Sequence, residues 1–145
     1  RATLLHITGV VNMTEASDYL ENALVDHITG KTSYTKPTAY VALCTAAPND
    51  ASTGTTMTEA AYTSYARVST AGSDWNASSA GSATNANAIT FPACTGGSES
   101  ITHFVLVDAA TAGNILVYSA LDASLAVSTG ITPTFAADAI TVTVS

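Results

Sequence analysis

Alternation of apolar and polar side chains is the main pattern in the second half of the chain. In AITVTV at residues 139–144, apolar Ile140, Val142 and Val144 alternate with threonines, as in a strand with one face in a core. Other short runs are rich in β-branched and aromatic residues and are bounded by Pro, Gly, Asn or Asp. These patterns predict strands at residues 38–45, 65–70, 88–94, 101–107, 114–121, 131–135 and 139–144.

Two apolar runs, ITHFVLV at 101–107 and NILVYSAL at 114–121, give the strongest of these signals. They flank DAATAG, whose Gly113 permits a tight turn, so we expect a hairpin of two largely buried strands. The runs at 131–135 and 139–144 are expected to supply the last pair of strands.

Helical periodicity is convincing in one segment near the beginning of the chain. Leu20, Leu24 and Ile28 follow one another at i, i+4 and i+8, and Thr14 or Ser17 can cap the start of such a helix. The spacing predicts a short amphipathic helix that covers one side of an apolar layer. With the strands, it predicts a mainly β fold: an antiparallel β-sandwich or jelly-roll-like domain with one N-terminal amphipathic helix.

Charged side chains are scarce. They make up 10% of the 145 residues, against roughly 25% in an average soluble domain, and the net charge is −7. The basic residues Arg1, Lys31, Lys36 and Arg67 are scattered, whereas phosphate backbones and anionic membranes are bound by clustered basic residues. We therefore expect neither nucleic acid nor a membrane as a partner. A neutral, hydrogen-bonding surface suits contact with other protein subunits.

The first twelve residues, RATLLHITGVVN, differ from the rest of the chain. Met13 begins a segment that reads like a natural protein start, so residues 1–12 are either an added or processed extension or a genuine arm. The arm hypothesis rests on strand-like side chains, which are Leu4, Leu5, Ile7, Val10 and Val11. An apolar arm can grip a neighbouring subunit. Residues 13–145 are expected to form a single β-rich structural domain.

His103 is the histidine that comes closest to a catalytic arrangement. A Ser–His–Asp set could be assembled around it, but no GxSxG turn surrounds any serine of the chain. On an alternating strand it shares its face with Ile101, Val105 and Val107. A lone histidine in that position is more often a core or interface residue than a catalyst. We therefore expect no catalytic residues and no enzymatic activity.

Cysteine and acid spacings also predict no metal ion and no cofactor. Cys44 and Cys94 lie outside any CxxC pair, so they are either small core residues on strands or partners in one bridge between neighbouring strands. The acids that fall in loops, such as Asp50 and Glu59, show no spacing that singles out a pair. A glycine-rich phosphate loop is missing.

Two aromatic residues, Tyr62 and Trp75, sit in or beside polar segments. An aromatic residue in such a place either packs on the core or is presented to a partner, since Tyr and Trp are common interface anchors. We favour core packing for both and keep partner contact as the second interpretation. An exposed pair flanked by Asp and Asn could instead stack on sugar rings.

From Met13 onward the chain resembles a family of small tailed-bacteriophage virion proteins, of the tail-fibre or capsid-decorating type. The residues that carry the resemblance are SDYLENALVDHITG (17–30), PTAYVALCTAAPNDA (37–51), YARV (65–68), ITFPAC (89–94), ITHFVLVDAATAGNILVYSAL (101–121) and FAADAITVTV (135–144). The resemblance implies a virion component present in several copies and made in the host cytoplasm. It brings no catalytic residues.

The sequence thus supports two functions of different kinds. The first is a non-enzymatic structural subunit of a bacteriophage virion, in a capsid decoration, tail or tail fibre, which packs against other virion proteins and against copies of itself as a homo-oligomer. The alternative is a carbohydrate- or receptor-binding β-sandwich module, for which Tyr62 and Trp75 would form the binding surface.

Overall fold

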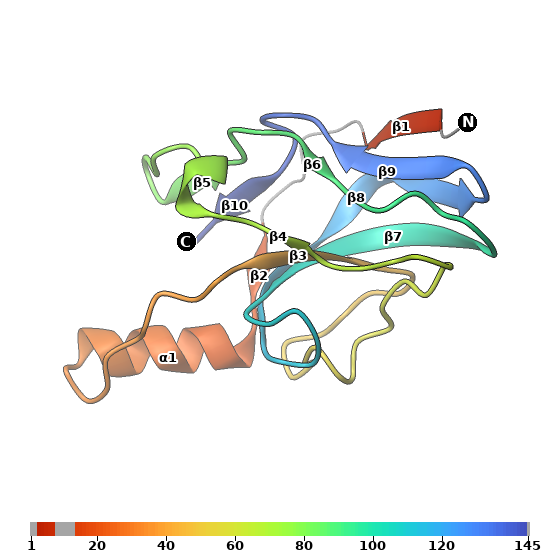
Figure 1. Cartoon of the computed structure of the whole chain (residues 1–145). Helices are drawn as coiled ribbons and strands as arrows, with labels where there is room; N and C mark the ends of the chain where they lie inside the picture. Colours follow the sequence, from red (N-terminus) through yellow and green to blue (C-terminus); the bar gives the residue numbers. More distant parts are fainter. Residues whose placement is uncertain (1–2, 8–13, 145) are drawn as a thin grey trace.

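The computed structural model describes residues 3–7 and 14–144 of the chain. Strands dominate these residues, and one α-helix extends away from them at one end of the molecule (Figure 1). In chain order the elements are β1 (Thr3–Ile7), β2 (Glu15–Ala16), α1 (Asp18–Ile28), β3 (Tyr40–Cys44), β4 (Val68–Ser69), the 3-10 turn η1 (Gly72–Asp74), β5 (Ser82–Thr84), β6 (Ile89–Thr90), β7 (Ser98–Val107), β8 (Ile115–Ser128), β9 (Ile131–Phe135) and β10 (Thr141–Thr143).

The described strands form three sheets. The largest is antiparallel, with strand order β2-β8-β7-β3-β4. A smaller sheet has the order β1-β9-β6, in which β1 runs parallel to β9, and β10 pairs with β5. The prediction of a mainly β, sandwich-like fold with one helix is confirmed. The last two predicted strands are present as β9 and β10, and their neighbours are β1, β6 and β5, which are distant in the sequence.

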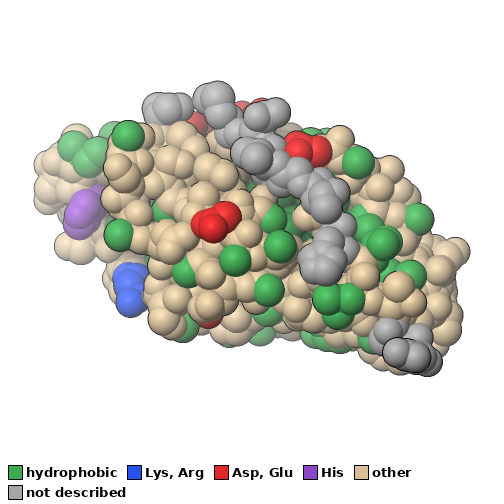
Figure 2. Space-filling model, turned by 90° about the horizontal axis from the view of Figure 1, so that it is seen from above, with side chains coloured by type: hydrophobic (Ala, Val, Ile, Leu, Met, Phe, Trp, Pro, Cys, Tyr) green, Lys and Arg blue, Asp and Glu red, His purple; other side chains and the backbone are tan. Residues whose placement is uncertain are grey.

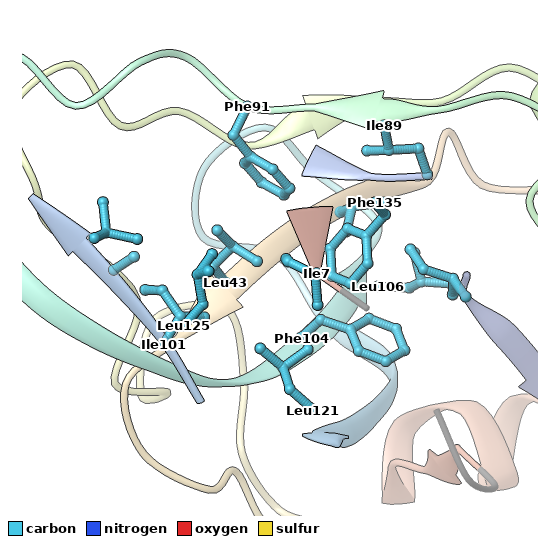
Figure 3. Close-up of a cluster of buried hydrophobic side chains, with 14 of the residues drawn as sticks. Ile7, Leu43, Ile89, Phe91, Ile101, Phe104, Leu106, Leu121, Leu125 and Phe135 are labelled. Carbon is cyan, nitrogen blue, oxygen red and sulfur yellow. The ribbon is translucent and has the colours of Figure 1, made fainter. Parts of the chain in front are cut away.

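The main core lies between the two larger sheets. Phe104 of β7 meets Phe135 of β9 edge to face, with ring centroids 5.7 Å apart, and Phe91 approaches Phe135 at 6.3 Å. Figure 3 shows Ile7 of β1 pointing into the same cluster, close to Leu43 and Phe135. Edge-to-face contacts of this kind favour particular ring positions in addition to burying apolar area. The aromatic residues therefore fix how the sheets face each other.

The hairpin of β7 and β8 is confirmed and is longer than predicted. Its turn includes Gly113, which has a positive φ of 77°. Ile101 pairs with Leu125 and His103 with Ala120, so residues 121–124 bulge opposite a single residue of β7. A bulge shifts the alternation of side chains along a strand.

Because of this bulge, the expectation that His103 shares a face with Ile101 is wrong. Ile101 instead packs in the main core with Phe104 and Leu106, whereas Val105 and Val107 pack on the opposite face of the sheet. The sequence gives no local signal for the shift, since an uninterrupted apolar run fits either register.

The opposite face of the large sheet carries a second, smaller core. Val105, Val107, Ile115 and Cys44 pack there with Met57, which comes from the loop that follows β3. Because Met57 is buried there, this loop covers part of the second core.

Both cysteines are unpaired and buried. Cys44 belongs to the second core and Cys94 to the main one. The interpretation as small core residues is therefore confirmed, although of the two only Cys44 lies on a strand.

Helix α1 begins where the capping pattern predicts and then leaves the body of the protein. Ser17 is the N-cap, and its Oγ accepts the N–H of Leu20 at 3.3 Å. Leu20 is buried, but Ile28 is 81% exposed. The expected helix is confirmed, whereas its expected role is only partly correct, because only its beginning covers the sheet (Figure 1).

Candidate interaction surfaces

The candidate contact residues of the first segment divide into an inner and an outer group. Ile7 is buried in the core of its own chain, whereas Leu4 and Leu5 are 56% and 37% exposed. Val10 and Val11 lie outside the described residues. Strand β1 thus uses Ile7 to hold itself on β9 and presents leucines to the exterior.

Tyr62 and Trp75 lie in different places and do not form a common aromatic shelf. Tyr62 is buried, and its hydroxyl donates to the carbonyl oxygen of Pro92 at 2.9 Å. Burial raises the pKa of Tyr62 to about 12. Trp75 is half-buried, and its indole N–H donates to Thr70 Oγ1 at 3.1 Å. It lines a pocket of about 200 Å³ together with Lys36 and other residues.

The outer half of α1 presents apolar side chains, among them Ile28, which was expected to cover an apolar layer. We define the α1 stripe as Leu24, Val25 and Ile28, which fall within an arc of about 100° on a helix with 3.6 residues per turn. Leu24 is half-buried, whereas Val25 is 58% and Ile28 81% exposed. The sequence shows that the apolar face of the helix continues beyond Leu20. Whether these side chains are exposed depends on how far the sheet extends beneath the helix.

A polar groove lies at the base of α1 and adjoins the α1 stripe. We define the acidic groove as the hollow of about 580 Å³ that Glu15, Glu21 and Asp50 line with Leu24 and Val144. It contains three carboxylates, and it also contains apolar surface because Val144 is 51% exposed.

A tyrosine at this site contacts two of the acids. The hydroxyl of Tyr118 lies within hydrogen-bonding distance of Glu15 Oε2, at 2.9 Å, and of Asp50 Oδ1. Burial and these two carboxylates raise the pKa of Tyr118. One hydroxyl carries one proton, so it donates to one carboxylate at a time. The shared contact holds both acids close together beneath the helix.

A buried ion pair lies next to β4, at the edge of the large sheet opposite β2. We define the Arg67 clasp as Glu59, Tyr65 and Arg67. The side chain of Arg67 is 4% exposed, and its Nε and Nη2 donate to the two carboxylate oxygens of Glu59, each at 2.8 Å. Its other N–H groups donate to backbone carbonyls at 2.8 to 2.9 Å; these are the carbonyls of Gly54, Ala109 and Ala112. All five donors of the guanidinium are therefore used.

Tyr65 connects the clasp to the sheet. Its hydroxyl donates to Glu59 at 2.8 Å and accepts the N–H of Leu43 at 3.0 Å. Burial, together with the Glu59 carboxylate, raises the pKa of Tyr65. A cleft of about 480 Å³ lies beside the clasp. The polar groups of the clasp are already bonded to one another and to backbone carbonyls, so the clasp joins the loop between β3 and β4 to the turn between β7 and β8. The clasp was not predicted from the sequence, although a single arginine in the run YARV indicated a buried, paired charge.

His103 does not take part in a relay of catalytic groups. Its Nδ1 is 2.8 Å from the hydroxyl of neighbouring Thr102, and burial lowers the pKa of His103. Asp108 instead accepts the backbone and side-chain N–H groups of Asn114, at 2.7 and 2.8 Å, and so stabilises the hairpin turn. Within residues 3–7 and 14–144 there is no group of three or more His, Cys, Asp or Glu side chains that could hold a metal ion.

The fold and these surfaces define a class of protein: a small, mainly antiparallel β domain with a protruding helix and uncovered apolar side chains. Residues 15–143 match the family model described as podophage GP4 fiber I protein gp80. The match spans most of the chain, so this protein belongs to that family of bacteriophage fibre proteins. It is thus a phage fibre structural protein by family, and the family implies contact with other virion proteins. The predicted resemblance to phage virion proteins is confirmed.

No curated protein matches the chain. None of the helices in the described residues has the length and apolar character needed to cross a membrane.

Proposed function

We propose that this chain is a non-enzymatic structural subunit of a bacteriophage fibre, which works by packing against other virion proteins and against copies of itself. The observation that carries the proposal is the α1 stripe, whose Val25 and Ile28 remain 58% and 81% exposed in a protein of the fibre family. Exposed apolar side chains grouped on one face mark sites of protein contact.

The distribution of charge supports protein partners over nucleic acid. Arg67 is buried in its clasp. Among the described residues, the exposed Lys and Arg side chains are therefore Lys31 and Lys36 alone. Figure 2 shows this scarcity on one face, where the Lys and Arg colour occurs only at one end. Binding to a phosphate backbone requires several such cations in one patch.

The internal pairing of polar groups supports a structural role over catalysis. Catalytic acids and bases have perturbed pKa values in clefts where they can reach a substrate. In the Arg67 clasp the raised pKa of Tyr65 comes from burial, and the tyrosine, the carboxylate and the guanidinium are bonded to one another. The clasp is therefore better suited to hold loops together.

The first segment provides a second proposed contact. In our proposal residues 1–12 act as an arm attached to the domain of residues 13–145 through Ile7, and Leu4 and Leu5 face a neighbouring subunit. Strand β1 lies at the edge of its sheet and pairs only with β9 among the described strands. Such an edge can add a strand from another chain.

The virion itself gives the direct test. Purified phage particles would be probed with an antibody raised against this protein, and the number of copies per particle measured by quantitative mass spectrometry. We expect several copies in each particle and loss of the signal when fibres are removed. Presence in the infected lysate but absence from washed particles would overturn the proposal.

A carbohydrate- or receptor-binding role remains the alternative, and its candidate place is the small pocket beside Trp75 and Lys36. Fluorescence of the protein's single tryptophan, titrated with host glycans, tests it. Saturable quenching that Trp75→Phe abolishes would favour the alternative, and a flat response would favour the structural role.

A further inference from the structure

The α1 stripe and the acidic groove form one continuous surface, because Leu24 belongs to both. The groove lies at the beginning of the helix and the exposed Val25 and Ile28 lie towards its end. The opposite side of α1 is already occupied by its own chain, where the N–H of Tyr34 donates to His27 Nδ1 at 3.1 Å. The surface is therefore open along one side of the helix only.

Charges of opposite sign lie near the two ends of α1. Glu15, Glu21 and Asp50 line the groove at the base. Lys31 follows the helix end, and its side chain is 74% exposed. Its one described ion pair, with Asp26 at 3.6 Å, is a surface contact of little energetic value, so the ammonium can exchange partners. The surface is thus apolar in the middle and acidic at one end, and Lys31 lies beside its other end, paired with Asp26.

We propose that two copies of this chain associate through α1, antiparallel and about a two-fold axis near Val25. This pairing rests on the proposed structural function and identifies the surface that performs it. An axis there places the helix end of each copy over the acidic groove of the other, so Ile28 meets apolar groove residues and Lys31 meets the acids. Only the antiparallel arrangement brings Lys31 of each copy to the acidic groove of the other at both ends of the contact. A two-fold contact of this kind forms a complete dimer that needs no further copies.

The helix is long enough for this contact. Its eleven residues span about 16 Å at 1.5 Å per residue. Residues at equal distances on either side of the axis lie opposite each other, so Ile28 lies opposite the Glu21 region of the partner. Packing then covers Val25 and Ile28, which the chain leaves exposed, and the charges fix the direction of the helices.

Charge exchange between two variants provides the sharpest test, with mass measured by analytical ultracentrifugation. The wild-type protein is expected to dimerise, with weaker association at higher salt. Lys31→Glu and Glu21→Lys should each weaken the dimer about tenfold or more, because each places like charges opposite each other twice. An equimolar mixture of the two variants should restore a heterodimer, since both of its contacts are again attractive.

Apolar variants form the second arm of the experiment. Ile28→Asp should give a folded monomer, judged by circular dichroism, whereas Thr129→Asp, in the exposed turn between β8 and β9, should remain dimeric. A wild-type monomer at all concentrations, an oligomer of another size, or a dimer that tolerates Ile28→Asp would overturn the pairing. Copies found in virions despite such a result would leave the structural function standing, which separates the two failures.

Discussion

The Arg67 clasp and the α1 stripe differ in how completely the chain surrounds them. In the clasp a charged side chain is 4% exposed, and each of its donors has a partner within the same chain. In the stripe an apolar side chain is 81% exposed although burial would stabilise it. Buried charge without partners is costly enough to prevent folding, so the clasp must be complete in the monomer. Exposed apolar surface costs less, so its cover can come from another subunit.

The largest effect is expected from breaking the clasp. Arg67→Ala leaves Glu59 without its ion partner and three backbone carbonyls without donors, so the free energy of unfolding should fall by about 3 to 5 kcal/mol. Chemical denaturation of the purified variant measures this change. Lys36→Ala is the matched control, because that cation is exposed and should matter by less than about 0.5 kcal/mol. Equal losses in both variants would show that the clasp has no special role.

Alkaline pH should weaken the clasp through Tyr65. The folded state holds the phenolic proton more tightly than the unfolded state, so this stabilisation is complete below pH 10 and is lost as the pH rises further. Above pH 10 the wild type should lose about 1.4 kcal/mol more per pH unit than Tyr65→Phe. Denaturation curves for both proteins at pH 8, 10 and 11 measure the difference. Parallel pH profiles would contradict this account of the buried hydroxyl.

A smaller loss of stability is expected from a substitution at Ser17, where α1 joins the large sheet. Ser17→Ala removes the oxygen that caps the helix and the hydroxyl that donates to the Ile115 carbonyl on β8. The free energy of unfolding should fall by about 1 kcal/mol. Thermal denaturation monitored by circular dichroism is suitable, with the exposed Ser33→Ala as control. No difference between the two variants would mean that the cap is dispensable.

The smallest effect on the isolated monomer is expected from the stripe. At protein concentrations too low for association, Ile28→Ala should change the free energy of unfolding by less than about 0.5 kcal/mol. Leu20→Ala, on the buried part of the same helix, should cost about 2 kcal/mol or more. Denaturation of both variants in dilute solution tests this contrast. Similar losses of unfolding free energy in the two variants would mean that Ile28 is packed as firmly as Leu20 in solution.

Local patterns were sufficient for β3, β7, β8, β9 and β10 and for the start of the helix, whereas β5 was not predicted and the strands expected at 65–70 and 88–94 are reduced to β4 and β6. Residues 139–144 and 101–107 contain strands because β-branched side chains and alternation act over a few neighbours. Ser17 could be read as a cap because its side chain bonds within one turn. Patterns of this range do not define which strands become neighbours, so they did not predict that β9 pairs with β1 and β6 and that β10 pairs with β5.

The sequence by itself determined the mainly β composition, the long hairpin, the single described helix and the scarcity of charge. Tertiary structure decided the rest, because each remaining feature depends on contacts between distant residues. The bulge opposite Thr102 sets which side chains share a face with His103. Arg67 becomes a clasp only where its own loop, between β3 and β4, meets the distant turn between β7 and β8. Ile28 follows the same helical period as Leu20, yet it is exposed because the sheet ends before it does.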